Sequence, residues 1–207
     1  MLESGQTLSA RYTLVRRLGA GGHGEVWLAA DRERQGYVAL KILDPAFAGD
    51  ADAMRAFATM CERVRQLQHP NILKVAGLEH DGDTHFVASD YAAGADLSLL
   101  RGRPASEFIV HLISVAEALQ YAHEHGVVHG DLKPTNILVG SDGNAQLGDF
   151  SATAGSPYNT SPQRLNGAAL TPADDIYGFG AVSYELLSGY PPFYPQPTRE
   201  RVLNELV

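Results

Sequence analysis

Short apolar runs that alternate with polar residues characterise the first part of the chain, and this two-residue period predicts β-strands. In 37–43, for example, Val38, Leu40 and Ile42 are each separated by one residue. One helix is expected among the strands, from about Asp50 to Gln68, because its apolar positions recur every three or four residues. The predicted strands are 11–18, 25–30, 37–43, 72–78 and 85–91.

The rest of the chain has a mainly helical pattern. A broad apolar face predicts a long helix from Ser106 to about Glu124, and a second apolar helix is expected at Asp175–Ser188. Short strand segments are expected between these two helices, at 127–129, 137–139 and 146–147.

A small sheet with one helix followed by a mainly helical half predicts an α+β chain with two lobes. After 190–193 the pattern supports only one short helix, at about 198–206, so the second lobe is expected to be incomplete. The expected organisation is an N-terminal tail at 1–10, a first lobe at 11–91 and a second lobe at 92–207.

Composition excludes several classes of protein. Hydrophobic types make up 44% of the 207 residues, which is enough for one compact core. The 24 acidic and 16 basic residues give a net charge of −8, so no binding of nucleic acid or anionic membrane through bulk charge is expected. The single cysteine, Cys61, excludes an internal disulfide framework. Since the chain has neither a signal peptide nor the roughly 18 consecutive apolar residues of a membrane span, a cytoplasmic protein is expected.

A glycine-rich turn lies between the first two predicted strands. Gly19, Gly21 and Gly24 form a G-x-G-x-x-G pattern, and glycines allow backbone amides to approach a phosphate closely. Taken alone, the pattern is equally compatible with a flexible hairpin. A dinucleotide-binding turn requires a helix after the third glycine, whereas residues 25–30 continue as a strand. A strand–loop–strand turn can instead cover the phosphates of a nucleotide.

Lys41 lies within the apolar strand predicted at 37–43. A lysine in a strand is often a side chain that extends into solvent. Lys41 shares a strand face with Ala39, however, and follows the last glycine of the turn by seventeen residues. A lysine at this place can reach the α- and β-phosphates of a nucleotide.

Three oxygen-bearing side chains follow in a fixed order. Asn136 comes five residues after Asp131, and Asp149 follows thirteen residues later. Phosphoryl transfer needs one carboxylate to orient the attacking hydroxyl and oxygen ligands to hold magnesium on the triphosphate. Ordinary turn residues would explain each aspartate alone, but not their order after the glycine turn and the lysine.

With these motifs in this order, residues 11–207 resemble the eukaryotic-type (Hanks-type) Ser/Thr protein kinase family, in a bacterial-like form. The resemblance implies a protein-kinase-like bilobal fold, with a small β-sheet N-lobe plus one helix and a mostly helical C-lobe lacking its last helices. It also implies ATP and Mg²⁺ as cofactors and a protein substrate. Three further segments carry it: His69–Ile72, Ser161–Gln163 and Asp175–Gly180.

The resemblance assigns roles to individual residues. Asp131 would orient the hydroxyl, while Lys133 and Lys41 would stabilise charge on the phosphoryl groups. Asn136 and Asp149 would hold Mg²⁺. The implied nucleotide-binding residues, which include the gatekeeper position Ser89 and the hinge, are Leu18, Gly19, Ala20, Gly21, Gly24, Val26, Ala39, Lys41, Ser89, Asp90, Ala92 and Leu138.

One departure from the family pattern concerns the helix of the first lobe. Nine positions before His69, where the family has a glutamate that pairs with the strand lysine, the chain has Met60. Glu62 lies about 200° further round the helix, so it is not expected to replace that glutamate. Met60 is expected to pack in the core, and Lys41 to be placed by the phosphates or by another carboxylate such as Asp149.

Other departures surround the catalytic loop. Gly130 replaces the arginine that in the family reads a phosphate on the activation segment. That segment, from Asp149 to Gln163, spans only fourteen positions and leaves 151–154 as its loop. A switch by loop phosphorylation is therefore not expected. Ser151 stands where the family has a glycine, and its more restricted backbone is expected to bias the orientation of Asp149.

Three classes of function remain open. The first is an active Ser/Thr protein kinase. The second is a pseudokinase that binds nucleotide or acts as a scaffold, favoured by Met60, the short activation segment and the missing helices, with a regulatory partner in their place. The third is a small-molecule phosphotransferase, because His129–Asp131 also resembles the catalytic loop of aminoglycoside kinases. Lys133 and the helix start at Asp175 argue against this third class.

Overall fold

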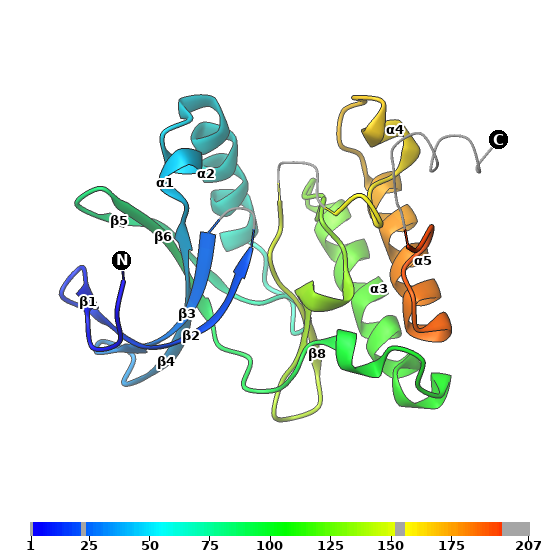
Figure 1. Ribbon diagram of the computed structural model, residues 1–207, viewed down its shortest axis with the longest axis horizontal. Helices are drawn as coiled ribbons and strands as arrows, with labels where there is room; N and C mark the ends of the chain where they lie inside the picture. The colour runs from blue at the N-terminus through cyan, green and yellow to red at the C-terminus, as the bar shows by residue number, and fades with distance from the viewer. Residues whose placement is uncertain (1, 22–23, 152–155, 196–207) are drawn as a thin grey trace. The chain divides into compact units, whose positions relative to one another are not determined.

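The computed structural model describes residues 2–21, 24–151 and 156–195, which form two compact units (Figure 1). The first unit contains the residues up to 66 together with 73–91. The second contains 67–72 and the residues from 92 onward. Each unit is described by itself below.

An antiparallel sheet of six strands forms most of the first unit. Its strands follow the order β1-β2-β3-β4-β6-β5, so only the connection from β4 to β5, which passes over the position of β6, departs from simple hairpins. This confirms the β-rich lobe expected from the two-residue period. The strands are β1 (Thr7–Leu8), β2 (Tyr12–Gly21), β3 (Gly24–Asp31), β4 (Gly36–Leu43), β5 (Val75–Asp81) and β6 (Thr84–Asp90).

Two helices, α1 (Pro45–Ala48) and α2 (Ala51–Arg65), connect β4 to β5. Helix α2 begins where expected, because the Asp50 carboxylate accepts hydrogen bonds from the backbone N–H groups of Asp52 and Ala53, both at 3.0 Å. Its buried face contains Phe57, Cys61 and Val64.

The two faces of the sheet carry separate apolar clusters. One cluster includes Tyr12, Trp27, Leu40 and Phe86, which are buried together on the face opposite Lys41. On the other face, the buried residues Leu43 and Val87 of the sheet pack against Phe57 and Cys61 of α2, with Met60 half-buried beside them. Helix α2 therefore covers one end of the sheet face that carries Lys41.

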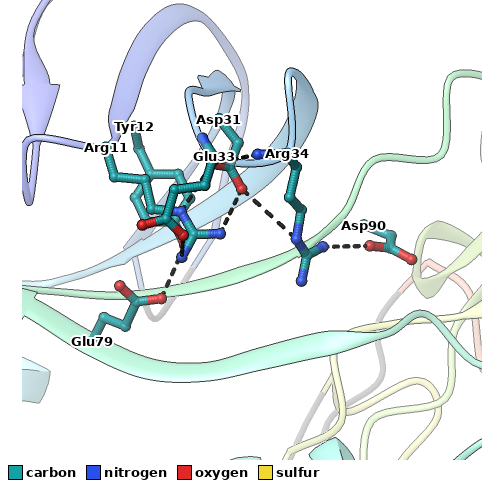
Figure 2. Close-up of polar contacts among 7 residues, drawn as sticks. All are labelled: Arg11, Tyr12, Asp31, Glu33, Arg34, Glu79 and Asp90. Carbon is teal, nitrogen blue, oxygen red and sulfur yellow. Dashed lines mark hydrogen bonds and ion pairs between the residues drawn. The ribbon is translucent and has the colours of Figure 1, made fainter.

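A charged network fixes the start of the chain to the sheet (Figure 2). Arg11 donates two hydrogen bonds, of 2.8 and 2.7 Å, to the buried carboxylate of Asp31. Arg34 contacts Asp90 at 3.1 Å, and the Tyr12 hydroxyl donates to Glu79 at 3.0 Å. Residues 1–10, described from the sequence as a tail, contribute β1 and a fully buried side chain, Leu8.

The second unit is mainly helical. Its long helices are α3 (Ile109–Glu124) and α5 (Pro172–Ser188), with a short helix α4 (Pro162–Leu165) between them. Helix α5 begins three residues before the predicted start, because Thr171 and Asp174 form a reciprocal capping box. The remaining elements are the hairpin β7 (Ile137–Val139) and β8 (Ala145–Leu147) and the 3₁₀ helices η1 (Leu97–Leu100), η2 (Ala105–Glu107) and η3 (Pro134–Asn136).

Two sequence predictions of strands were wrong. Residues 127–129 form no strand, because the backbone N–H of His129 donates to the Asp175 side chain instead of to a neighbouring strand. The strand predicted at 72–78 begins only at Val75. The helix expected at 198–206 lies outside the described residues. In the described part of the chain, no helix is long and apolar enough to cross a membrane.

Candidate active site

The loop after α3 places two polar side chains beside one carboxylate. The ammonium of Lys133 lies 2.6 Å from Asp131 Oδ2. Asn136 Nδ2 donates to the backbone oxygen of Asp131 at 2.8 Å and to Asp131 Oδ2 at 3.2 Å. The backbone N–H of Ser156 reaches Asp131 Oδ1 at 3.2 Å. The structure thus brings together three residues that the sequence had singled out, Asp131, Lys133 and Asn136.

A buried carboxylate of α5 holds the backbone just before Asp131. Asp175 is only 1% exposed, and it accepts hydrogen bonds from the backbone N–H groups of His129 at 2.8 Å and Gly130 at 2.9 Å. His123 Nε2 is 2.7 Å from the same carboxylate. The sequence reading used Asp175 only as part of a helix-start motif and missed this role. The available signal was an acidic residue at a helix position that the apolar pattern predicts to be buried.

The β7–β8 hairpin places the two expected metal ligands at one end. Ile137 pairs with Leu147, and the next residues outward are joined by a 2.9 Å hydrogen bond from the Gly148 N–H to the Asn136 oxygen. Asp149 follows directly. Asn136 and Asp149 are therefore brought close by strand register, although thirteen residues separate them in the sequence.

Asp149 has a left-handed backbone, with φ of 57°. Non-glycine residues adopt this conformation when the surrounding structure holds them there. The flanking residues are held by His129: its Nε2 contacts the Gly148 oxygen at 2.9 Å, and its ring lies 4.6 Å from the ring of Phe150. His129 is fully buried, and this burial lowers the pKa of its imidazole below the usual value.

The donor set at this end of the hairpin fits magnesium. Asn136 Nδ2 is used in bonds to Asp131, which leaves the amide oxygen as the atom able to ligate a cation. Asp149 is exposed and supplies carboxylate oxygens. Among the described residues, no group of three or more His, Cys, Asp or Glu side chains could hold a metal ion by itself. Mg²⁺ is characteristically held by one or two carboxylates together with substrate phosphates, so this sparse set suits it.

In the first unit, four of the expected nucleotide-binding residues share one face of the sheet. Lys41 lies opposite Val26 of β3, and Ala39 lies opposite Ser89 of β6. Since directly opposed residues, and residues two apart along a strand, point to the same side, these four side chains line one surface. This surface continues from the part of the sheet that α2 covers.

The glycines of the turn between β2 and β3 have different surroundings. A Cβ on Gly24, whose φ is 136°, would lie 1.9 Å from the backbone oxygen of Ile42. A Cβ on Gly19 or Gly21 would meet nothing within 4 Å. The third glycine is therefore required by the fold, whereas the first two leave open space beside the backbone. Leu18 and Ala20 lie on β2, together with Gly19 and Gly21.

Met60 occupies the helix position that carries glutamate in the kinase family, and its side chain packs against apolar neighbours. Met60 is half-buried against the cluster of Leu43, Phe57, Cys61 and Val87, as expected. Glu62 is exposed and forms an ion pair with Arg65. Glu62 therefore does not take the place of the absent glutamate.

Of the remaining expected nucleotide-binding residues, Asp90 belongs to the first unit, whereas Ala92 and Leu138 belong to the second. Asp90 ends β6, where its carboxylate binds Arg34. In the second unit, Leu138 of β7 forms a bridge with Asp96, and the Val139 N–H donates to the Ala95 oxygen at 2.8 Å, so the end of the segment that begins at Ala92 runs beside β7. Of the activation segment, 152–155 lies outside the described residues.

Comparison with known proteins agrees with this geometry. The family model of the protein kinase domain matches residues 12–206. Among curated proteins, the chain is 33% identical over 207 residues to the serine/threonine-protein kinase PrkC of Bacillus subtilis, covering 91% of this chain and 32% of PrkC. It is 31% identical over 212 residues to the serine/threonine-protein kinase PknA of Mycobacterium tuberculosis, covering 91% of this chain and 49% of PknA.

The fold is also similar to that of a solved kinase. The crystal structure of the Mycobacterium tuberculosis PknI kinase domain matches with a TM-score of 0.82 and 31% identity, covering all of this chain and 87% of that domain. The chain therefore belongs to the protein kinase family, and the fold expected from the sequence is confirmed. It spans about a third of the length of PrkC and about half of the length of PknA.

Proposed function

We propose that the chain transfers the γ-phosphoryl group of ATP to Ser or Thr hydroxyls of protein substrates. The observation that carries this proposal is the cluster in which Lys133 and Asn136 both contact the Asp131 carboxylate, at 2.6 and 3.2 Å. A carboxylate fixed in this way can accept a hydrogen bond from a hydroxyl and orient its oxygen for attack. The serine/threonine-protein kinases PrkC and PknA are relatives over 91% of the chain.

In the proposed reaction, a bond forms between the substrate oxygen and the γ-phosphorus while the bond from that phosphorus to the β,γ-bridging oxygen breaks. The hydroxyl proton passes to Asp131, and ADP leaves. Lys133, within contact of Asp131, stabilises negative charge on the group in transfer. Lys41 and the amides beside Gly19 and Gly21 bind the phosphates. Mg²⁺, when bound, supplies charge neutralisation on the phosphates.

The residues that we assign to each ligand are those implied by the resemblance to the protein kinase family. We assign Mg²⁺ to Asn136 and Asp149, which lie at one end of the β7–β8 hairpin. We assign the adenine ring to apolar side chains and to the hinge backbone. The proposed adenine contacts are Leu18, Val26, Ala39, Ser89, Asp90, Ala92 and Leu138. Since the reaction consumes ATP, we place it in the cytoplasm.

The test is transfer of radiolabelled γ-phosphate to a mixed protein substrate. Asp131→Asn and Asp149→Asn keep the size of the side chain and remove its charge, and each should lower transfer by about a hundredfold or more. Asp52→Asn is the matched control, because the Asp52 side chain is 92% exposed and pairs with the neighbouring Arg55 on the surface of α2. ATP binding by the wild type without any transfer would support a pseudokinase, and transfer to small metabolites alone would support the third class.

A further inference from the structure

Gly130 touches the backbone that follows Asp149. A Cβ built on Gly130 would lie 2.3 Å from the backbone oxygen of Ser151 and 2.9 Å from Leu170 Cδ2. Carbon and oxygen atoms in folded proteins do not approach this closely. The leucine side chain could move aside, but the Ser151 oxygen belongs to the backbone. Any side chain at residue 130 would therefore displace the segment that contains Ser151.

That segment is attached to the catalytic loop on both sides of Asp149. Before it, the Gly148 oxygen contacts His129 Nε2 at 2.9 Å. After it, the ring of Phe150 packs on the His129 ring and the Ser151 N–H donates to the His129 oxygen at 2.8 Å. Both attachments lie on His129, the residue directly before Gly130.

Gly130 itself is held in place from the other side. Its N–H donates to Asp175 Oδ1 at 2.9 Å, and its φ of 78° is one that L side chains rarely adopt. Because Asp175 is buried in α5, the position of Gly130 is fixed by the core of the second unit. Ser151 therefore rests against a rigid surface, and the left-handed backbone of Asp149 is held between Gly148 and Ser151.

We propose that Gly130 is a positioning residue for Asp149: because it has no side chain, the Ser151 carbonyl can lie against it, and this contact holds Asp149 in position to ligate a cation. The assignment of Mg²⁺ to Asp149 rests on the proposed function, whereas the contact of Gly130 with Ser151 does not. The loss of arginine at residue 130 is then more than the loss of a phosphate-reading side chain. It leaves the space that the Ser151 carbonyl occupies.

The chain offers a closely matched control. Gly143, in the turn between β7 and β8, has φ of 80°, and a Cβ there would meet nothing within 4 Å. Gly143→Ala therefore imposes the same backbone strain as Gly130→Ala without the contact with Ser151. The double variant Gly130→Ala/Leu170→Ala removes the leucine contact and leaves the clash with the backbone oxygen.

The experiment measures two quantities in each variant: hydrogen exchange of the Ser151 amide, and the Mg²⁺ concentration that gives half-maximal ATP binding in calorimetry. In Gly130→Ala the Ser151 amide should exchange about tenfold faster or more, and the Mg²⁺ requirement should rise by a similar factor. Binding of ATP without metal should stay as in the wild type, which separates loss of positioning from general damage. Gly143→Ala should behave as the wild type, and the Leu170→Ala change should not rescue Gly130→Ala.

Wild-type exchange at Ser151 in Gly130→Ala would overturn the proposal, as would full rescue by Leu170→Ala, because the backbone contact would then not matter. If Gly130→Ala does not fold, Phe150→Leu loosens the same segment with Gly130 intact. It should raise the Mg²⁺ requirement in the same direction, and an unchanged requirement there also overturns the proposal. Failure of the wild type to bind ATP would count against the proposed function, while exchange at Ser151 would still decide whether Gly130 holds the segment.

Discussion

The Lys133 ammonium lies 2.6 Å from Asp131 Oδ2, two residues away along the catalytic loop. The loop between them is extended at Lys133 and then turns into the 3₁₀ helix η3. This places a fixed positive charge beside the carboxylate proposed to orient the substrate hydroxyl. Lys133 can therefore act in the transition state, where charge builds on the phosphoryl group, without taking part in binding the nucleotide base.

Lys133→Met should lower kcat by about a hundredfold while changing the KM for ATP by less than about threefold. The reason is that methionine keeps the length of the side chain and removes the charge that stabilises the phosphoryl group in transfer. Initial rates at varied ATP concentration measure both constants. Lys74→Met, at an exposed position, is the control and should leave both unchanged. A large rise in KM with an unchanged kcat would instead assign Lys133 to ground-state binding.

Asp175→Asn tests the support beneath the catalytic loop. The asparagine amide group would face backbone N–H donors at His129 and Gly130, so at least one buried hydrogen bond would be lost. Unfolding free energy should fall by about 2–4 kcal/mol, measured by urea denaturation. Asp52→Asn, at a side chain that is 92% exposed, should cost less than about 0.5 kcal/mol. Equal stability of the two variants would show that Asp175 does not support the loop.

Much of the fold could be predicted from local patterns. The alternation in β4 and the spacing in α2 were sufficient, because each of these elements has one buried face. The cap at Asp50 was likewise visible, since an aspartate before an apolar helix satisfies free backbone donors. Asp131, Asn136 and Asp149 could be singled out as candidates because their spacing within a loop and a hairpin is itself local information.

Contacts between distant segments could not be predicted in this way. The apolar run 127–129 reads as a strand, but the Val127 N–H donates to the end of α3 and the His129 N–H donates to Asp175, which lies 46 residues after His129. The same limit applies to Gly130, whose missing side chain matters only because Ser151 lies against it. A single sequence shows which residues are unusual, whereas the neighbour that makes them necessary is set by tertiary packing.

The ion pair between Arg11 and Asp31 should make stability depend on pH (Figure 2). Hydrogen bonds from Arg11 lower the pKa of Asp31 to about 2, with burial opposing the shift and the backbone N–H groups of Glu33 and Arg34 adding to it. In the unfolded chain the pKa of an aspartate is about 3.9. Because the folded pKa is the lower one, the contribution to stability is complete above about pH 5 and is lost as the pH falls towards 2.

Urea denaturation at several pH values measures this effect. At pH 7, Asp31→Asn should be less stable than the wild type, and the difference should shrink steadily as the pH falls from about 5 to about 2. Asp52→Asn, at a side chain that is 92% exposed, should show no such convergence. A difference for Asp31→Asn that stays constant over this range would mean that the carboxylate does not carry the ion pair in solution.

The glycines of the turn between β2 and β3 are expected to differ in role: Gly24 is needed for the fold, and Gly21 for the proposed binding of phosphates. Gly24→Ala should lower the unfolding free energy by more than about 2 kcal/mol, because the new Cβ would lie 1.9 Å from the Ile42 oxygen. Gly21→Ala meets nothing within 4 Å, so stability should stay within about 0.5 kcal/mol of the wild type. If phosphates approach the backbone at Gly21, this variant should nevertheless raise the KM for ATP, because the methyl group occupies the space they need. Thermal unfolding and initial rates on the two variants separate these effects, and an unchanged KM in Gly21→Ala would remove Gly21 from the phosphate-binding residues.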